Sequence, residues 1–137
     1  MKRIAIVGNI GSGKSFVAKN FKFPIFDADR EVDRIYKKNK FCFRKLKKAL
    51  PKYIHSFPVN KINIANAILK NSKNLKKIIN IIHPEVRHKM NLFLKKNNNR
   101  KIVILDIPLF LENKLNKKND ILIFVDASKK EIYKRLK

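Results

Sequence analysis

The sequence has few of the residues that form covalent cross-links or cross membranes. Cys42 is the single cysteine among 137 residues, so no disulfide can form within the chain, as is typical of cytoplasmic proteins. No apolar run approaches the roughly 20 residues of a membrane span, and the start lacks the apolar segment of a secretory signal. A strand is predicted from residue 3, so we expect no cleaved leader. We expect one cytoplasmic domain over residues 1–137 with no membrane contact, long enough to bury a core.

Acidic residues are also scarce. The chain has 10 Asp and Glu against 34 Lys and Arg, which gives a net charge of +24. Such an excess is typical of nucleic-acid binders, but it also arises by compositional drift in sequences rich in lysine, asparagine and isoleucine. Because the lysines are spread along the whole chain, we favour drift and expect no nucleic-acid partner. In either case the positive field favours polyanionic small ligands such as nucleotides.

Glycine occurs only three times, and all three glycines lie in one segment. Residues 8–15, Gly-Asn-Ile-Gly-Ser-Gly-Lys-Ser, fit G-x-x-x-x-G-K-[ST] at every fixed position. A β-branched apolar run at residues 3–7 precedes the segment and predicts a buried strand, and an apolar stripe at residues 17–21 predicts a helix after it. The sequence therefore predicts a P-loop between a strand and a helix.

The residue types of this loop suit the binding of phosphates. Successive backbone N–H groups can converge on an anion only where side chains do not crowd them, and the helix that follows directs its positive end at the same place. Lys14 can reach the β- and γ-phosphates of a nucleotide, and the Ser15 hydroxyl can bind Mg²⁺. The loop predicts a phosphate site but does not identify a substrate.

Carboxylates follow two further predicted strands. Asp27 and Asp29 come after the strand at residues 24–26, and Asp106 ends the strand at residues 101–106. In open parallel sheets ligands lie beyond the carboxyl ends of the strands, so these acids can serve as a general base or hold Mg²⁺. For Asp27 and Asp29 an acid-rich helix start explains the residues equally well. For Asp106 we favour a magnesium ligand over a simple turn residue.

The middle of the chain is predicted to be mostly helical. Residues 30–50 form one helical stretch that loosens at residues 37–40, and an irregular stretch with an exposed His55 follows between Pro51 and Pro58. Helical spacing then predicts buried faces made by Ile64, Ala65, Ile68 and Leu69 and by Leu75, Ile78, Ile79 and Ile82.

Two more informative segments lie in the second half of the sequence, at residues 83–87 and 120–136. Pro84 is predicted in the first turn of a helix, with His83 near its cap and Arg87 one turn on, where the two can share an anion. An ordinary structural role explains this pair equally well. A fourth strand is predicted at residues 120–125. A capping box at residues 128–131 then opens a last helix, whose apolar side would be Ile132, Tyr133 and Leu136.

Taken in order, these motifs resemble dephospho-CoA kinase. The P-loop is generic, but residues 27–29 (Asp-Ala-Asp), 83–84 (His-Pro) and 106–112 (Asp-Ile-Pro-Leu-Phe-Leu-Glu) form a specific combination. The resemblance runs from Met1 to Lys137. It implies a three-layer α/β/α P-loop NTPase fold with a parallel core sheet, similar to nucleoside monophosphate kinases, and a helical acceptor-binding part at about residues 30–100. It implies transfer of the ATP γ-phosphoryl group to the 3′-hydroxyl of dephospho-CoA, the last step of coenzyme A synthesis.

The resemblance also implies roles for individual residues. The ATP-binding set would be Gly8, Asn9, Ile10, Gly11, Ser12, Gly13, Lys14, Ser15, Phe16 and Arg135. Asp29 would be the catalytic base, Lys14 the second catalytic residue, and Ser15 and Asp106 the holders of Mg²⁺. The acceptor would contact Asp27, Asp29, His83, Arg87, Pro108 and Glu112.

Several positions depart from the family's pattern. Phe16 stands where the family usually has Thr, Asp33 where many members have His, and Lys61 where they have Arg. Arg135 is the only residue that matches the family's lid. The family's last strand has no counterpart here, which would leave the strand at residues 120–125 as an open edge through which the chain could self-associate. Two alternatives stay open: another small-molecule or nucleotide P-loop kinase, and an inactive relative that only binds nucleotides.

Overall fold

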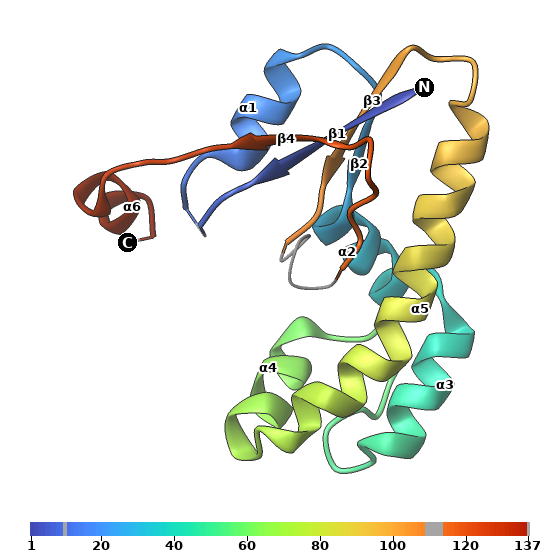
Figure 1. Ribbon diagram of the computed structural model, residues 1–137. Helices are drawn as coiled ribbons and strands as arrows, with labels where there is room; N and C mark the ends of the chain where they lie inside the picture. Colours follow the sequence, from blue (N-terminus) through green and yellow to red (C-terminus); the bar gives the residue numbers. More distant parts are fainter. Residues whose placement is uncertain (10, 109–113, 137) are drawn as a thin grey trace. The chain divides into compact units, whose positions relative to one another are not determined.

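The computed structural model describes residues 1–9, 11–108 and 114–136 (Figure 1). The chain divides into two compact units. We call Met1–Asp29 with Leu92–Lys137 the sheet unit and Arg30–Asn91 the helical unit. Across the described residues, no helix has both the length and the apolar character needed to cross a membrane.

The elements follow the order expected of an α/β chain with a helical insertion. The strands are β1 (Lys2–Val7), β2 (Ile25–Asp27), β3 (Ile102–Asp106) and β4 (Ile121–Phe124). The helices are α1 (Lys14–Asn20), α2 (Ala28–Lys38), α3 (Lys40–Ala49), α4 (Lys61–Lys70), α5 (Lys73–Lys96) and α6 (Lys129–Leu136). All four strands lie within two residues of their predicted positions.

The four strands form one parallel sheet in the order β2-β3-β1-β4. Because the strands are parallel, their carboxyl ends share one edge of the sheet. Asp106 is in register with Ile6 of β1 on one side and with Asp27 of β2 on the other. Among the described strands β4 pairs only with β1, so within this part of the chain the fourth strand is an edge strand, as predicted.

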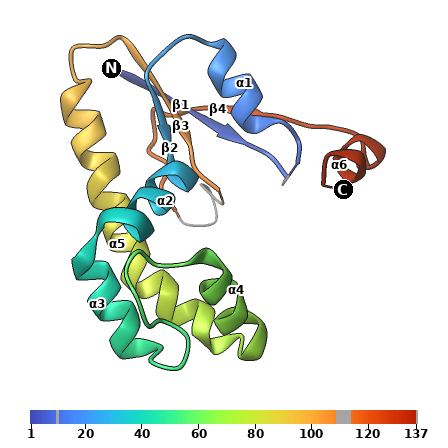
Figure 2. The ribbon, with the colours of Figure 1, turned by 180° about the vertical axis from the view of Figure 1, so that it is seen from behind.

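Helices cover both faces of this sheet (Figure 2). Alternate residues of a strand point to opposite faces. On one face a buried cluster joins α1 to the central strands through Ile4, Ile6, Ala18 and Ile104. On the other face Phe26 is in register with Leu105, and its ring lies 5.7 Å from the ring of Phe93, in the last turns of α5. The sheet unit is therefore a three-layer α/β/α arrangement.

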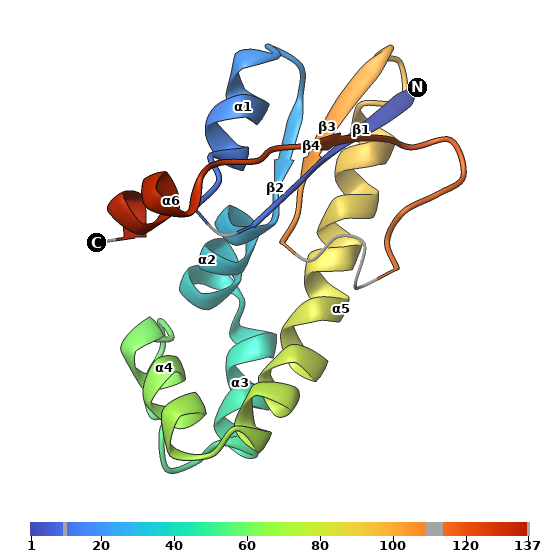
Figure 3. The ribbon, with the colours of Figure 1, turned by 60° about the vertical axis from the view of Figure 1, so that its left-hand side comes forward.

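The helical unit contains α3, α4 and most of α2 and α5 (Figure 3), and it has a core of its own. It consists of Ile35, Tyr36, Cys42, Leu46, Leu50, Ile54, Val59, Ile64, Ala67, Ile78 and Ile82. The Asn39 side chain accepts a hydrogen bond from the backbone N–H of Cys42 and caps α3. The loosening predicted at residues 37–40 is therefore a helix boundary.

The predicted inner face of α4 is partly wrong. Ile64 is buried as predicted, but Ala65 is exposed and Leu69 is 83% exposed, whereas Ala67 is fully buried. Leu75, at the start of α5, is also exposed. α4 has apolar residues on almost every side, so its sequence could not indicate which side would face the core.

The prediction for Pro84 is wrong. Pro84 does not begin a helix, and His83 does not cap one, because α5 runs through both residues from Lys73 to Lys96. An interior proline removes a hydrogen bond and costs about 3 kcal/mol. Ile78 and Ile82 before Pro84 and Met90 after it are all buried, and their packing outweighs this local cost.

The last helix has the predicted start but less burial than predicted. The Ser128 hydroxyl accepts from the Glu131 N–H, and the Glu131 carboxylate accepts from the Ser128 N–H, so the capping box is confirmed. Of the three residues predicted on its apolar side, Ile132 is half-buried, whereas Tyr133 and Leu136 are 65% and 60% exposed.

Candidate active site at the carboxyl edge of the sheet

The loop at residues 8–13 connects the end of β1 to the start of α1. A Cβ atom on Gly8 would lie 2.3 Å from the Val125 carbonyl oxygen, so no side chain fits where the loop passes the end of β4. Gly13 caps α1 with a φ of 97°, in the left-handed region that glycine adopts most easily. Gly11 has a φ of 78°, in the same region. All three glycines therefore suit the path of the loop.

The start of α1 is prepared for an anion. Gly13 gives the helix no side-chain cap, and its first turn has no acidic residue, so nothing in the helix neutralises its positive end. The Lys14 ammonium donates to the Gly8 and Asn9 carbonyl oxygens at 2.9 and 3.0 Å, which keeps its charge over the same loop.

Ser12 also fits a ligand in this loop. Its side chain is only 4% exposed, and its hydroxyl has no hydrogen-bond partner in the described part of the chain. A buried hydroxyl without a partner costs about 1–3 kcal/mol. A phosphate oxygen that accepted this hydrogen bond would remove that cost.

A serine of α1 and an aspartate of β3 form an oxygen pair beside the loop. The Ser15 hydroxyl donates to Asp106 Oδ2 at 2.8 Å, and Asp106 is 6% exposed. Burial raises the pKa of Asp106 and the charge of Asp27 adds to this, whereas the Ser15 hydrogen bond, Lys14 and Lys19 lower it. The carboxylate and hydroxyl oxygens are hard donors of the kind that Mg²⁺ prefers.

Few protein ligands are available for a metal besides this pair. The described residues contain no group of three or more His, Cys, Asp or Glu side chains that could hold a metal ion. This is compatible with Mg²⁺, which takes one or two protein ligands and completes its shell with waters and substrate phosphates.

The other predicted acids lie at the same edge. Asp27 ends β2 in register with Asp106, close enough for its charge to act on the Asp106 carboxyl. Asp29 lies two residues further on, in the first turn of α2, and is exposed. The parallel sheet thus brings Lys14, Ser15, Asp27 and Asp106 to one edge, and Asp29 follows directly.

Helix α6 lies against the loop. Arg135 donates from Nη1 to the Gly11 carbonyl oxygen at 3.1 Å. A Cβ atom on Gly11 would lie 3.2 Å from Ile132 and 3.3 Å from Leu136, so the apolar side of α6 contacts the loop backbone directly. Figure 1 shows α6 next to the turn between β1 and α1. The Arg135 guanidinium is therefore a second cation at the loop.

Four further residues of the predicted site lie at described positions, and two do not. His83 and Arg87 lie in the helical unit, where burial and the Arg87 charge lower the pKa of His83. Pro108 is exposed in the turn after β3, and Phe16 is 74% exposed in the first turn of α1. Ile10 and Glu112 lie outside the described residues.

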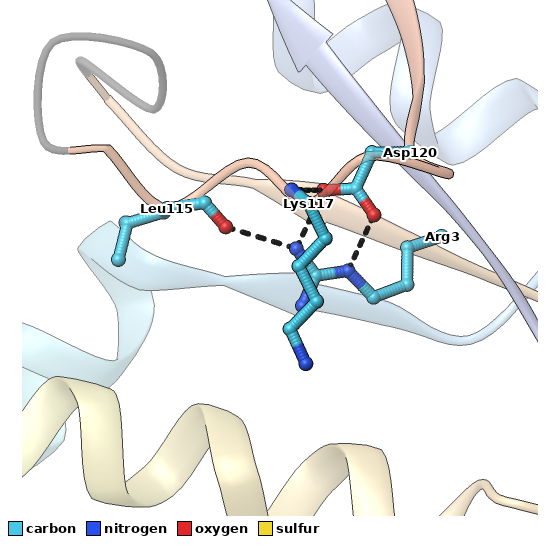
Figure 4. A network of polar contacts seen from close by, with 4 residues as sticks. All are labelled: Arg3, Leu115, Lys117 and Asp120. Atoms are coloured by element: carbon cyan, nitrogen blue, oxygen red, sulfur yellow. Dashed lines mark hydrogen bonds and ion pairs between the residues drawn. The ribbon is translucent and has the colours of Figure 1, made fainter.

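Two ion pairs between residues far apart in the sequence were not foreseen. Asp33 and Lys61, two positions that depart from the family's pattern, form an ion pair with each other in the helical unit. Arg3 donates from Nε and Nη2 to the Asp120 carboxylate at 2.8 and 2.6 Å, and from Nη2 to the Leu115 carbonyl oxygen at 3.0 Å (Figure 4). Asp120 also accepts from the Lys117 N–H. An arginine inside an otherwise apolar strand was the one available signal for the second pair.

Comparison with known proteins identifies the family. A model of the dephospho-CoA kinase family matches residues 2–137. The chain belongs to the dephospho-CoA kinase family. Dephospho-CoA kinases from Bartonella quintana and from the Wolbachia of Brugia malayi are 34% and 32% identical over 132 and 129 residues, which are 93% and 90% of this chain. The chain spans about two thirds of the length of these relatives, with 67% and 66% covered.

Solved structures confirm the fold of this family member. TT1252 from Thermus thermophilus matches with a TM-score of 0.77 and 28% identity, over 98% of this chain and 70% of that one. Dephospho-CoA kinase from Campylobacter jejuni matches with a TM-score of 0.65 over 98% of this chain and 94% of that one, and at 17% identity it supports the fold alone. The predicted P-loop NTPase fold with a parallel core sheet is confirmed.

Proposed function

We propose that this protein is an ATP-dependent dephospho-CoA kinase, which transfers the ATP γ-phosphoryl group to the 3′-hydroxyl of dephospho-CoA in the cytoplasm. The observation that carries the proposal is the convergence of Lys14, Ser15 and Asp106 at one edge of the sheet, with the Ser15–Asp106 hydrogen bond at 2.8 Å. The two units act as one kinase domain, in which the helical unit binds the acceptor.

The loop residues bind and hold the nucleotide. Backbone N–H groups at the head of α1 and the Ser12 hydroxyl bind phosphate oxygens, and Phe16 lies next to them along the helix. Lys14 exchanges the Gly8 and Asn9 carbonyl oxygens for β- and γ-phosphate oxygens. Arg135 leaves the Gly11 carbonyl in the same way. Phosphoryl transfer depends mainly on positioning and on neutralising charge, which these groups supply.

Mg²⁺ would be held by Ser15 and Asp106, and when bound it would supply positive charge that offsets the negative charge of the ATP phosphates. The burial of Asp106 and its hydrogen bond fix the direction in which its carboxylate points.

The acids at the edge of the sheet act on the acceptor. Asp29 accepts the proton of the 3′-hydroxyl, and Asp27 orients the ribose beside it. From the helical unit, Arg87 contributes positive charge for the acceptor's phosphates and His83, whose lowered pKa keeps it neutral, contributes a hydrogen-bonding ring. Pro108 and Glu112 complete the acceptor wall after β3.

A coupled assay for ADP release tests the proposal on the 137-residue chain with ATP and Mg²⁺. We expect turnover with dephospho-CoA and none above background with AMP, CMP or shikimate. Lys14→Ala abolishes turnover, whereas Lys48→Ala, an exposed lysine of α3, keeps it. Turnover with one of the other acceptors identifies a different small-molecule kinase. ATP binding without turnover of any acceptor identifies an inactive relative. Either result overturns the proposal.

A further inference from the structure

The helical unit contains a pocket that none of the proposed kinase-site residues lines. Its volume is about 640 Å³. The segment after α3 supplies Lys52, Tyr53 and His55, and α4 supplies Asn63, Asn66, Leu69 and Lys70. Asn63, Asn66 and Lys70 are spaced three and four residues apart, so they share one face of the helix.

The wall formed by residues 51–60 is well anchored. The N–H groups of Tyr53 and Ile54 both donate to the Leu50 carbonyl oxygen at 3.0 Å, and the Ile54 side chain is 1% exposed in the core. At the other end the Val59 N–H donates to the Tyr36 carbonyl oxygen at 2.9 Å. The backbone of the segment is thus held on both sides of His55 without a ligand.

The second wall is equally fixed. The Asn60 side chain accepts from the Ile62 N–H and caps α4. Ile64 and Ala67 bury the adjacent side of the helix in the core. Asn63, Asn66 and Lys70 are therefore held facing the pocket by the packing of the helix that carries them.

The chemistry of the lining selects an anion. No carboxylate lines the pocket, and the sequence has no aspartate or glutamate between Asp33 and Glu85. Lys52 and Lys70 bring two positive charges, and the two asparagine amides bring neutral donors. Tyr53 and Leu69 add a ring and an apolar surface. A purely inorganic anion would leave that apolar part unused.

We propose that this pocket binds a phosphate ester with a planar ring, of about the size of a mononucleotide, as a site additional to the P-loop. Lys52 and Lys70 hold the phosphate, Asn63 and Asn66 donate hydrogen bonds, and the ring lies against Tyr53 and Leu69. The volume lies within the range of about 300–1,000 Å³ usual for small-molecule sites. The proposal does not depend on the identity of the kinase substrate.

The direct test is a titration of the full chain with AMP, followed by NMR of the histidine ring protons. The chain has three histidines, and the spectrum of a His55→Gln variant assigns the His55 signals. Without Mg²⁺ and at about 0.15 M salt, we expect a saturable shift of the His55 signals with AMP. Adenosine and inorganic phosphate, each alone, produce shifts only at concentrations about 10-fold higher or more.

Paired variants separate the pocket from the general positive charge. Lys52→Gln with Lys70→Gln weakens AMP binding about 10-fold or more, because both charges of the site are lost. Lys48→Gln with Lys76→Gln removes the same charge from exposed positions on the neighbouring helices α3 and α5 and leaves binding unchanged.

Several results would overturn the proposal. These are no saturable His55 shift with AMP, equal binding of adenosine or of phosphate alone, and equal weakening by both double variants. Binding of single-stranded RNA with a steep salt dependence, in a chain that does not bind AMP, would assign the basic surface to nucleic acid instead.

Discussion

Ser15 and Asp106 are 91 positions apart in the chain and share a hydrogen bond of 2.8 Å. The bond joins the first turn of α1 to the carboxyl end of β3, so the phosphate loop and the neighbouring strand tip are fixed to each other before any ligand is present. It also fixes one oxygen of a carboxylate that is almost completely buried. A buried carboxylate beside a second acid is costly, and a protein keeps such a group where its charge has a use.

We predict that Asp106→Asn raises stability and removes activity. Asparagine can still accept the Ser15 hydrogen bond, but it carries no charge that must be desolvated or repelled by Asp27. At pH 7 the free energy of unfolding rises by about 1 kcal/mol, while Mg²⁺-dependent turnover is lost. Urea unfolding and the coupled assay measure the two effects.

The stability gain expected for Asp106→Asn depends on pH, and the direction of that dependence follows from the pKa of Asp106. Burial, with help from Asp27, raises the pKa of Asp106 in the folded protein above its ordinary value of 3.8. The folded state therefore holds the proton more tightly than the unfolded state, and the wild type loses stability as the pH rises from about 3.8 through the raised pKa. The advantage of the asparagine variant grows over that window and is absent below it. An advantage of the same size at pH 3 and pH 7 would contradict this explanation.

The ion pair of Arg3 and Asp120 gives a second prediction. Their side chains are 7% and 4% exposed, so replacing one partner leaves the other charge buried and unpaired. Arg3→Met or Asp120→Asn is expected to lower the free energy of unfolding by about 3–5 kcal/mol. The double variant is expected to lose less than the sum of the single losses. Chemical denaturation of the three variants measures these differences.

The pair of Asp33 and Lys61 is the matched control for this prediction. Its side chains are 38% and 61% exposed, so removing either charge is expected to cost less than about 1 kcal/mol. If the two pairs give equal losses, burial is not the reason that Arg3 and Asp120 matter.

Local rules were enough to predict much of the sheet and its functional edge. The P-loop, the strands and the acids after them follow from short patterns, and parallel strands necessarily gather their carboxyl ends. The sequence therefore predicted Lys14, Ser15, Asp27 and Asp106 as neighbours without any contact information. The capping box of Ser128 and Glu131 is likewise a pattern of four residues.

Features that depend on distant contacts could not be predicted in the same way. Arg3 and Asp120 lie 117 positions apart, and neither residue has a local pattern that identifies its partner. Pro84 has a strong local preference for a helix start, but packing on both sides of it overrides that preference. The orientation of α4 depended on which of several apolar sides the rest of the helical unit would cover.

The close approach of Gly8 to Val125 leads to a third prediction. A methyl group at Gly8 would lie 2.3 Å from a backbone oxygen, which cannot move as the end of a flexible side chain can. Gly8→Ala is therefore expected to displace the loop or the end of β4, to cost about 2 kcal/mol or more of stability, and to weaken ATP binding. Calorimetry and thermal unfolding measure both. Asn98→Ala, at an exposed turn position outside the loop, is the control and should change neither by much.

Arg135 provides the last prediction. Its guanidinium donates a hydrogen bond to the Gly11 carbonyl oxygen of the loop, and its side chain is exposed. Arg135→Gln should change stability by less than about 0.5 kcal/mol, because the helix it belongs to has no buried residue. An arginine that neutralises the transferring phosphoryl group contributes about 10³–10⁵ in rate in other enzymes. We therefore expect kcat to fall by about 10²-fold or more, with Lys134→Gln, the neighbouring exposed cation, as the control. If Arg135→Gln raises KM for ATP but leaves kcat unchanged, the prediction is wrong. Arg135 would then bind the nucleotide equally in the ground state and the transition state.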